Sequence, residues 1–330
     1  MTQLTPPPGR ARFASRPDLP GERGRAGPAS PASAEVPALT PARVWWSAVR
    51  PATIAASVAP VLAGTAIAVH AGGARLGAGL LALLVGIAMQ VGVNFANDYS
   101  DHVRGADSPR RVGPLRAASS GVVEPEAVRR AAVAAFGVAA LAGLVLSLVT
   151  DWRLLLVGVA CLLAGWLYTG GPRPYGYLGL GEVFVFVFFG LVATVGTVYV
   201  ETLSVTPLAV LMACAMGGFA TAILVLNNLR DLDTDRASGK LTLATRIGRE
   251  RTQVLLVALV AVAFFIPIAV TALGLGAATV LLALVAIPIA ASPVRSALTT
   301  DAAPELVRAL KRMAMAELAY ALLFSLGLLL

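Results

Sequence analysis

The sequence predicts an all-α, polytopic membrane protein with about nine transmembrane helices. Of its 330 residues, 57% are hydrophobic and only 13% are charged, whereas soluble domains average about 25% charged residues. The apolar residues gather into runs close to the ~20 residues that a helix needs to cross a bilayer. The basic residues are distributed very unevenly between these runs, which supports the same topology.

Nine apolar segments follow one another after residue 40, and each is predicted to be a spanning helix. They cover approximately residues 46–70, 79–99, 127–149, 153–169, 181–200, 207–228, 252–272, 275–292 and 313–330. Several segments are short. Pro60, Pro267 and Pro288 are expected to kink the helices that contain them.

The first 40 residues differ in composition from the rest of the chain. They are rich in Pro, Ala, Gly, Ser and Arg and show no apolar periodicity, which is typical of disordered segments. They also lack the apolar core of a signal peptide. We therefore expect residues 1–40 to be a basic cytoplasmic tail and residues 41–330 to be the transmembrane domain.

The charge distribution predicts the orientation of the helices. With nine helices, all of the 26 Lys and Arg residues except Arg75 and Arg153 fall on one side of the membrane. Basic loops mark the cytoplasmic side, so the N-terminus is expected in the cytoplasm and the C-terminus outside, in the cell (inner) membrane. The net charge of +8 follows from this bias and does not indicate a nucleic-acid partner.

Two acidic stretches, both on the predicted cytoplasmic side, each follow an apolar run. In each stretch an asparagine and two aspartates recur at intervals of three or four residues, which places them on one helical face. They are Asn94, Asp98 and Asp101 in the first stretch and Asn227, Asp231 and Asp235 in the second. A carboxylate inside a membrane costs roughly 3 kcal/mol, so this arrangement indicates two halves of one metal site. Solvated loop charges with helix-capping aspartates are the alternative.

The residue types in these stretches favour a particular ligand. Mg²⁺ prefers oxygen ligands and binds through carboxylates together with substrate phosphates, and the two cysteines and two histidines do not form a metal-binding pattern. Arginine and lysine suit the same phosphates. The candidate diphosphate-binding residues are Asn97, Arg104, Arg111, Arg116, Arg230 and Lys240.

These motifs resemble the signatures of the UbiA-type intramembrane aromatic prenyltransferases. The first signature is Asn97-Asp98-Tyr-Ser-Asp101, and the second is Asp231-Leu-Asp-Thr-Asp235-Arg-Ala-Ser-Gly239-Lys240. The first one departs from the family pattern, because Gly105 stands where a third aspartate is expected and the nearest carboxylate is Asp107. The resemblance covers about residues 44–330.

Finer details resemble the menaquinone-pathway members of this family, which prenylate 1,4-dihydroxy-2-naphthoate. The similar pieces include Arg50-Pro51-x-Thr53, Arg111-x-Gly113-Pro114-x-Arg116 and Tyr168-Thr-Gly-Gly-Pro172. The Gly/Pro-rich piece after Tyr168 is equally typical of a tight interhelical turn.

The resemblance implies a helix bundle around a central cavity, in which Mg²⁺ and a polyprenyl diphosphate bind beneath loops. It implies metal ligation by Asp98, Asp101, Asp107, Asp231 and Asp235. It implies catalytic roles for Asp98, Asp101, Asp231, Asp235 and Lys240. From their positions, the acceptor-binding candidates are Arg50, Asn94 and Tyr168, and the aromatic residues that could stabilise an allyl cation are Phe95, Tyr99, Tyr168 and Tyr175.

The reaction implied is transfer of the prenyl group to dihydroxynaphthoate with loss of CO₂, which yields demethylmenaquinone. A family member with another acceptor, such as 4-hydroxybenzoate or homogentisate, is the first alternative. A transporter is a more distant alternative, because transporters place charged residues near the membrane midplane, whereas these acidic residues cluster at one interface.

Overall fold

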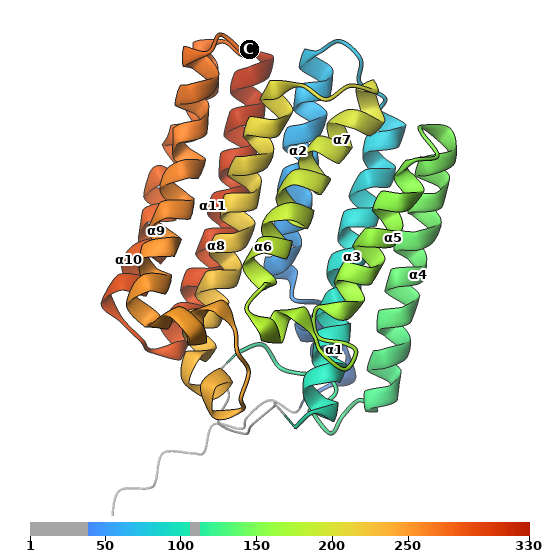
Figure 1. Ribbon diagram of the computed structural model, residues 1–330, viewed down its shortest axis with the longest axis vertical. Helices are drawn as coiled ribbons and strands as arrows, with labels where there is room; N and C mark the ends of the chain where they lie inside the picture. Colours follow the sequence, from blue (N-terminus) through green and yellow to red (C-terminus); the bar gives the residue numbers. More distant parts are fainter. Residues whose placement is uncertain (1–38, 106–112) are drawn as a thin grey trace, which may run out of the picture. The chain divides into compact units, whose positions relative to one another are not determined.

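The computed structural model describes residues 39–105 and 113–330, and within these residues every regular element is helical (Figure 1). The first half comprises α1 (Pro41–Val49), α2 (Pro51–His70), α3 (Leu76–Val103), α4 (Pro125–Val149), α5 (Leu154–Leu167), the 3₁₀-helix η1 (Tyr175–Leu178) and α6 (Gly181–Val185). The second half comprises the π-helix η2 (Phe186–Val192), α7 (Ala193–Thr202), α8 (Pro207–Ala237), α9 (Leu243–Ala272), the 3₁₀-helix η3 (Ala278–Ala286), α10 (Ile287–Thr299) and α11 (Ala303–Leu329).

The membrane-protein class is confirmed. In the described part of the chain, 8 helical segments are long and apolar enough to cross a bilayer, and some of them consist of several shorter elements joined end to end. The predicted segment 153–169 corresponds to α5, which is shorter than the others at 14 residues. The expected number of about nine helices therefore holds when α5 is counted with the 8 longer segments.

Three predicted segments contain interruptions that periodicity did not reveal. Segment 46–70 breaks at Arg50, which adopts a left-handed conformation (φ 54°) between α1 and α2, because the proline that follows disfavours a helical conformation at this residue. Segment 181–200 contains the π-helix η2, and segment 275–292 begins as the 3₁₀-helix η3. Pro288 was expected inside a helix but lies in the first turn of α10, where proline is well tolerated.

The most buried element is α8, which packs against α9, α11, α2 and η2. Its side chains Met212, Met216 and Phe219 are fully buried in the main hydrophobic core. The π-helix approaches α8 closely at Gly190, where an added Cβ would lie 2.4 Å from the Cα atom of Gly217. A glycine is therefore required for this contact.

Gly190→Ala is expected to destabilise the protein by about 1–3 kcal/mol, because the new methyl group would overlap backbone atoms of α8 that cannot move aside. The measurement is the midpoint of thermal unfolding in detergent. Gly137→Ala on α4 is the matched control, because nothing lies within 4 Å of its added Cβ and alanine favours a helix. An equal midpoint for the two variants would contradict the close packing of η2 on α8.

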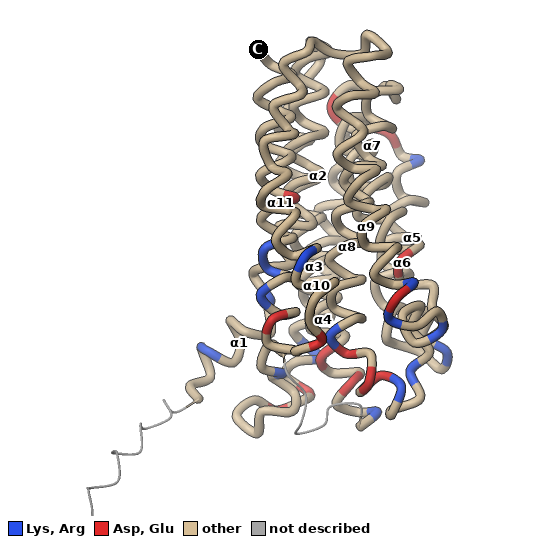
Figure 2. The backbone as a smooth tube through the Cα atoms, turned by 90° about the vertical axis from the view of Figure 1, so that its left-hand side faces the viewer, with Lys and Arg blue, Asp and Glu red and all other residues tan. Residues whose placement is uncertain are grey.

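Charged residues gather at one end of the bundle (Figure 2), which is the end where α3 and α8 finish. Both acidic stretches are helical throughout, since α3 continues to Val103 and α8 to Ala237. The predicted faces are therefore real: Asp98, Asp101, Asp231 and Asp235 are all buried, whereas Asp233 is exposed.

Candidate active site

A cavity of about 500 Å³ lies among α2, α3, α4, α5, η2, α7 and α8. Most of its lining is apolar, but polar side chains concentrate where α2, α3 and α8 approach the charged end of the bundle. These polar side chains are Arg50, Thr53, Ser57, Gln90, Asn94, Asn97, Tyr168 and Asn227. On α3 the lining extends from Ala82 to Asn97, which corresponds to about 22 Å of helix rise. The shape suits a long apolar ligand with a polar head.

The first acidic stretch is covered by the segment that follows residue 112. Asp98 is 1% exposed, and its Oδ2 accepts a hydrogen bond of 2.7 Å from the backbone amide of Ala117. Asp101 accepts hydrogen bonds from Tyr177 Oη at 2.7 Å and from Arg116 Nη2 at 2.5 Å. The two carboxylates are thus held in place by the loops that pack against the end of α3.

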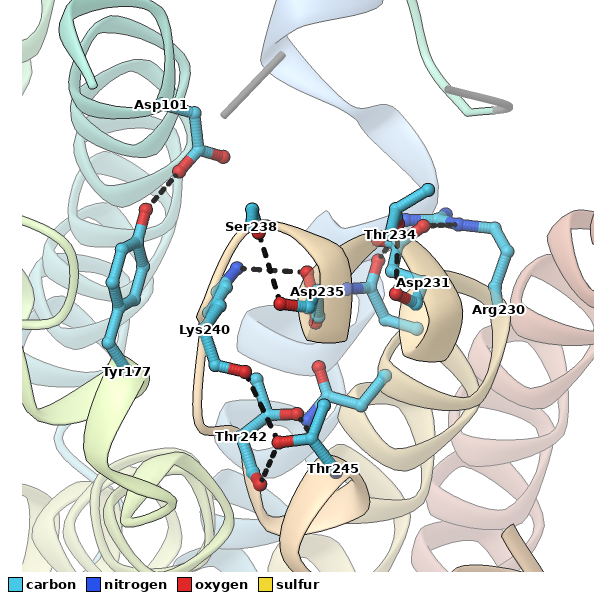
Figure 3. A network of polar contacts seen from close by, with 12 residues as sticks. Asp101, Tyr177, Arg230, Asp231, Thr234, Asp235, Ser238, Lys240, Thr242 and Thr245 are labelled. Carbon is cyan, nitrogen blue, oxygen red and sulfur yellow. Dashed lines mark hydrogen bonds and ion pairs between the residues drawn. The ribbon is translucent and has the colours of Figure 1, made fainter. Parts of the chain in front are cut away.

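The second acidic stretch carries its own basic partners (Figure 3). Arg230 Nε donates to Asp231 Oδ1 at 2.7 Å, and its Nη2 donates to Asn227 Oδ1 at 2.8 Å. Lys240 Nζ lies 3.8 Å from Asp235 Oδ1, and the Lys240 backbone amide caps α8 by donating to the Asp235 carbonyl. Each buried aspartate of α8 therefore has a basic partner close to it in the sequence, Arg230 for Asp231 and Lys240 for Asp235.

Tyr177 connects the two stretches. It lies on η1, and its ring faces Lys240 Nζ at 4.9 Å and the Arg104 guanidinium at 5.3 Å, while its hydroxyl donates to Asp101 (Figure 3). Burial, together with the negative charge of Asp101, raises the pKa of Tyr177, so the hydroxyl stays protonated and remains a donor. An unbroken series of contacts therefore runs from Asp101 through Tyr177 and Lys240 to Asp235.

Tyr177→Phe is expected to lower the kcat of the reaction that the sequence signatures imply by about 3- to 10-fold. The substitution removes one hydrogen bond to a charged group but leaves the ring beside both cations. Steady-state turnover would measure the effect. Tyr199→Phe is the control, because Tyr199 makes a similar bond of 2.6 Å to Asp151, a residue that is not part of this site. An equal loss in both variants would mean that the Tyr177 hydroxyl has no special role.

The remaining predicted residues divide into three groups. Arg50, Asn94, Asn97 and Tyr168 line the cavity, and Asn97 Oδ1 accepts a hydrogen bond of 2.7 Å from Thr169. Arg104 and Arg116 lie beside the first stretch, whereas the side chain of Arg230 is only 2% exposed and is engaged with Asp231. Asp107 and Arg111 lie outside the described residues.

The four aromatic candidates also separate. Tyr168 and Tyr175 line the cavity, and the Tyr175 ring stacks on Phe184 with 4.0 Å between ring centroids. Phe95 and Tyr99 instead pack in a separate hydrophobic cluster, where Phe95 meets Trp45 edge-on. The aromatic side chains that line the cavity therefore come from the end of α5, from η1 and α6, and from η2, which adds Phe188 and Phe189.

Sequence reasoning missed two residues of the site, Gln90 and Tyr177. Gln90 stands four residues before Asn94 and seven before Asn97, so its spacing placed it on the same face of α3. Tyr177 lies five residues beyond the Gly/Pro-rich piece Tyr168–Pro172, outside the residues that the sequence analysis singled out. No spacing rule could have paired it with Asp101, which is 76 residues away.

The oxygen-rich donor set fits Mg²⁺, but not as a site made of protein ligands alone. Among residues 39–105 and 113–330, no three His, Cys, Asp or Glu side chains are grouped closely enough to hold a metal ion. Mg²⁺ characteristically binds through one or two carboxylates and completes its shell with water and substrate phosphates. Asp98 and Asp101 on α3 and Asp231 and Asp235 on α8 would supply those carboxylates.

The fold and the site together describe a multi-pass membrane protein in which Asp, Arg and Lys side chains gather near the polar end of an apolar cavity. Residues 57–316 match the UbiA prenyltransferase family, and the chain belongs to this family. The family membership predicted from the two aspartate signatures is confirmed.

Several characterised relatives are similar over most of the chain. The 1,4-dihydroxy-2-naphthoate octaprenyltransferase of Mycobacterium tuberculosis (strain ATCC 25618 / H37Rv) is 44% identical over 281 residues, which cover 84% of this chain and 94% of the relative. The enzyme of the same name from Haemophilus influenzae (strain ATCC 51907 / DSM 11121 / KW20 / Rd) is 34% identical and covers 87% of this chain and 96% of its own.

Solved structures share the fold at low sequence identity. A UbiA homolog from Archaeoglobus fulgidus, bound to GPP and Mg²⁺, superposes with a TM-score of 0.58 at 14% identity and covers 85% of this chain and 99% of that one. A UbiA homolog from Aeropyrum pernix K1 superposes with a TM-score of 0.57 at 16% identity, covering 87% and 98% of the two chains.

Proposed function

We propose that this protein transfers a polyprenyl group from polyprenyl diphosphate to 1,4-dihydroxy-2-naphthoate, with loss of CO₂, to give demethylmenaquinol, the reduced form of demethylmenaquinone. The observation that carries the proposal is the long apolar cavity, whose polar end meets two aspartate-rich helix ends and their Arg and Lys partners. The similarity to curated 1,4-dihydroxy-2-naphthoate octaprenyltransferases supports the choice of acceptor.

The diphosphate would bind between α3 and α8. When bound, Mg²⁺ supplies positive charge that stabilises the departing diphosphate. Lys240, Arg104 and Arg116 surround the same region and would stabilise negative charge where it develops as the allylic C–O bond breaks and its electron pair leaves with the diphosphate. Asp101 and Asp235 orient these cations through their contacts with Arg116 and Lys240.

The apolar part of the cavity would hold the prenyl chain and keep water from the allyl cation. Tyr168 and Tyr175 present aromatic faces there, which attract a cation. The electron-rich naphthoate ring then forms a carbon–carbon bond with the cation, and cleavage of its carboxylate as CO₂ returns an electron pair to the ring. Arg50 at the break between α1 and α2 would position that carboxylate.

The test uses detergent-purified protein with MgCl₂, a prenyl diphosphate and a panel of aromatic acid acceptors, with products identified by mass and released CO₂ counted. We expect prenylated naphthoquinol and CO₂ in equal amounts, and the loss of both on chelation of Mg²⁺. A product only with another acceptor, such as 4-hydroxybenzoate, would overturn the acceptor assignment. The absence of any covalent product would overturn the enzyme class in favour of transport.

We further propose that the protein lies in the cell membrane with its active site on the cytoplasmic side. The clustering of basic residues at the end that carries the aspartates supports this orientation (Figure 2). Residues 41–330 would suffice for activity, with residues 1–40 as a dispensable tail. Cysteine accessibility in intact cells, and turnover of a chain that begins at residue 39, test these two statements.

A further inference from the structure

The polar end of the cavity contains a hydrogen-bond network between α2 and α3. Gln90 Nε2 donates to Thr53 Oγ1 and to Asn94 Oδ1, both at 3.1 Å. Asn94 Nδ2 donates to the Val49 carbonyl at 2.8 Å and to Thr53 Oγ1 at 3.1 Å. The Thr53 hydroxyl donates to the Arg50 carbonyl at 2.9 Å. The network therefore rests on two backbone carbonyls at the break between α1 and α2.

Those two carbonyls determine the direction of every hydrogen bond in the network. A backbone carbonyl can only accept, so the Asn94 amide must present its NH₂ group to Val49 and its oxygen to Gln90. Thr53 gives its single hydroxyl hydrogen to Arg50 and is left with acceptor capacity alone. Gln90 must therefore turn its NH₂ group toward Thr53 and Asn94, where both of its hydrogens are used.

The amide oxygen of Gln90 remains for a ligand. It receives no hydrogen bond from any residue in the described ranges, and it is not among the fully enclosed polar atoms. Gln90 lines the cavity and is 7% exposed overall. Gln90 thus brings an unused hydrogen-bond acceptor to the lining of a mostly apolar cavity. It lies eight residues, or about 12 Å of helix rise, from Asp98.

Only one of the two proposed substrates offers a matching donor. The diphosphate presents negatively charged acceptor oxygens, which the Gln90 oxygen would repel, and the prenyl chain has no polar hydrogen. An aromatic diol carries O–H groups that an amide oxygen can bind. A hydrogen bond accepted from a phenolic hydroxyl also raises the electron density of the ring, which favours attack on a cation.

We propose that Gln90 Oε1 accepts a hydrogen bond from one hydroxyl of the aromatic acceptor and so determines acceptor specificity, with Thr53 and Asn94 as the residues that position its amide. The inference rests on the proposed function and deepens it. No proton is transferred in this contact; the hydroxyl keeps its hydrogen throughout the carbon–carbon bond formation.

The experiment compares 1,4-dihydroxy-2-naphthoate with its 1-methyl and 4-methyl ethers as acceptors for the wild type and Gln90→Leu. In the wild type, one ether should react with a kcat/KM about 10- to 100-fold below that of the diol, because the methyl group leaves the amide oxygen unpaired. In Gln90→Leu, kcat/KM for the diol should fall by a similar factor and the discrimination against that ether should shrink to about 3-fold or less. The KM for the prenyl diphosphate should not change.

Three further variants separate specificity from damage to the fold. Gln253→Leu is the control, because Gln253 on α9 also uses its Nε2 to link two helices, donating to the Ala297 carbonyl of α10 at 2.7 Å, and it does not line the cavity. It should retain wild-type discrimination. Thr53→Val should reproduce part of the Gln90→Leu effect. Thr53→Ser, which keeps the hydroxyl, should retain the wild-type discrimination.

The inference is overturned if Gln90→Leu keeps the full discrimination between the diol and both ethers, or if the wild type does not discriminate at all. An equal loss with all three acceptors at unchanged ratios would also overturn it, since that result describes a structural role. Failure of the proposed function looks different, because the wild type would then make no product from the diol while reacting with another acceptor or with none.

Discussion

Asp231→Asn is expected to lower kcat by about a thousandfold, because this carboxylate would be lost both as a ligand for Mg²⁺ and as the partner of Arg230. The side chain of Arg230 is 2% exposed, so the substitution leaves a buried positive charge that is only partly compensated. Turnover with saturating Mg²⁺ and both substrates is the primary measurement, and the thermal midpoint in detergent shows how much of the loss is structural.

The matched control for this prediction lies two residues further along the same helix. Asp233 carries the same charge, but it is exposed and lies off the face that Asp231 shares with Asp235. Asp233→Asn should therefore keep kcat within about 2-fold, as is usual for surface substitutions. Equal losses at the two positions would contradict the model in which one face of α8 carries the chemistry.

Lys240→Met is expected to lower kcat by about 100- to 1000-fold, which is the usual effect of removing one group that stabilises charge in a transition state. Lys240 Nζ lies between Asp235 and the Tyr177 ring. The backbone around it is fixed, because its amide donates to the Asp235 carbonyl and its carbonyl accepts from Thr245. The loss should appear in kcat more than in KM, because the charge that Lys240 stabilises grows as the C–O bond breaks.

The chain contains one other lysine, Lys311, which is exposed on α11, and Lys311→Met should behave like the wild type. Lys240→Arg keeps the charge but changes its geometry, so a partial recovery of about 10-fold over Lys240→Met is expected. Wild-type turnover by Lys240→Met would remove this residue from the proposed mechanism.

The helices and the acidic faces could be predicted because each depends on residues that are close in sequence. Asp98 and Asp101, or Asp231 and Asp235, reveal their common face through spacing alone. The break at Arg50 was missed because apolar residues continue on both sides of it, although the proline that follows is a boundary signal visible in the sequence. The π-helix was missed because its extra residue per turn leaves no mark in a segment that is apolar on all sides.

The contacts that bring the two acidic stretches together could not be predicted, because they depend on tertiary packing. Arg230 illustrates the difficulty: a cation near a diphosphate site can bind either the substrate or its own neighbour, and the structure pairs it with Asp231. Tyr177 occupies its place only because the connection after α5 brings it to Asp101 near the end of α3 and to Lys240 just after α8. The polar residues of α2 and α3 meet for the same reason, since Gln90 and Thr53 are 37 residues apart.

The shortness of α5 has a consequence for the surrounding lipid. Its 14 residues rise only about 21 Å, whereas the hydrocarbon core of a bilayer is about 30 Å thick. Leu156 and Leu163 are exposed on this helix, and Trp152, just before it, is 66% exposed, as an interfacial anchor would be. A helix shorter than the bilayer is accommodated by thinning of the lipid or by flanking side chains that reach the interface, and hydrophobic mismatch of this kind costs a fraction of a kcal/mol per Å. Because α5 also forms one wall of the cavity, this flank is where a change in membrane thickness would act on the enzyme first.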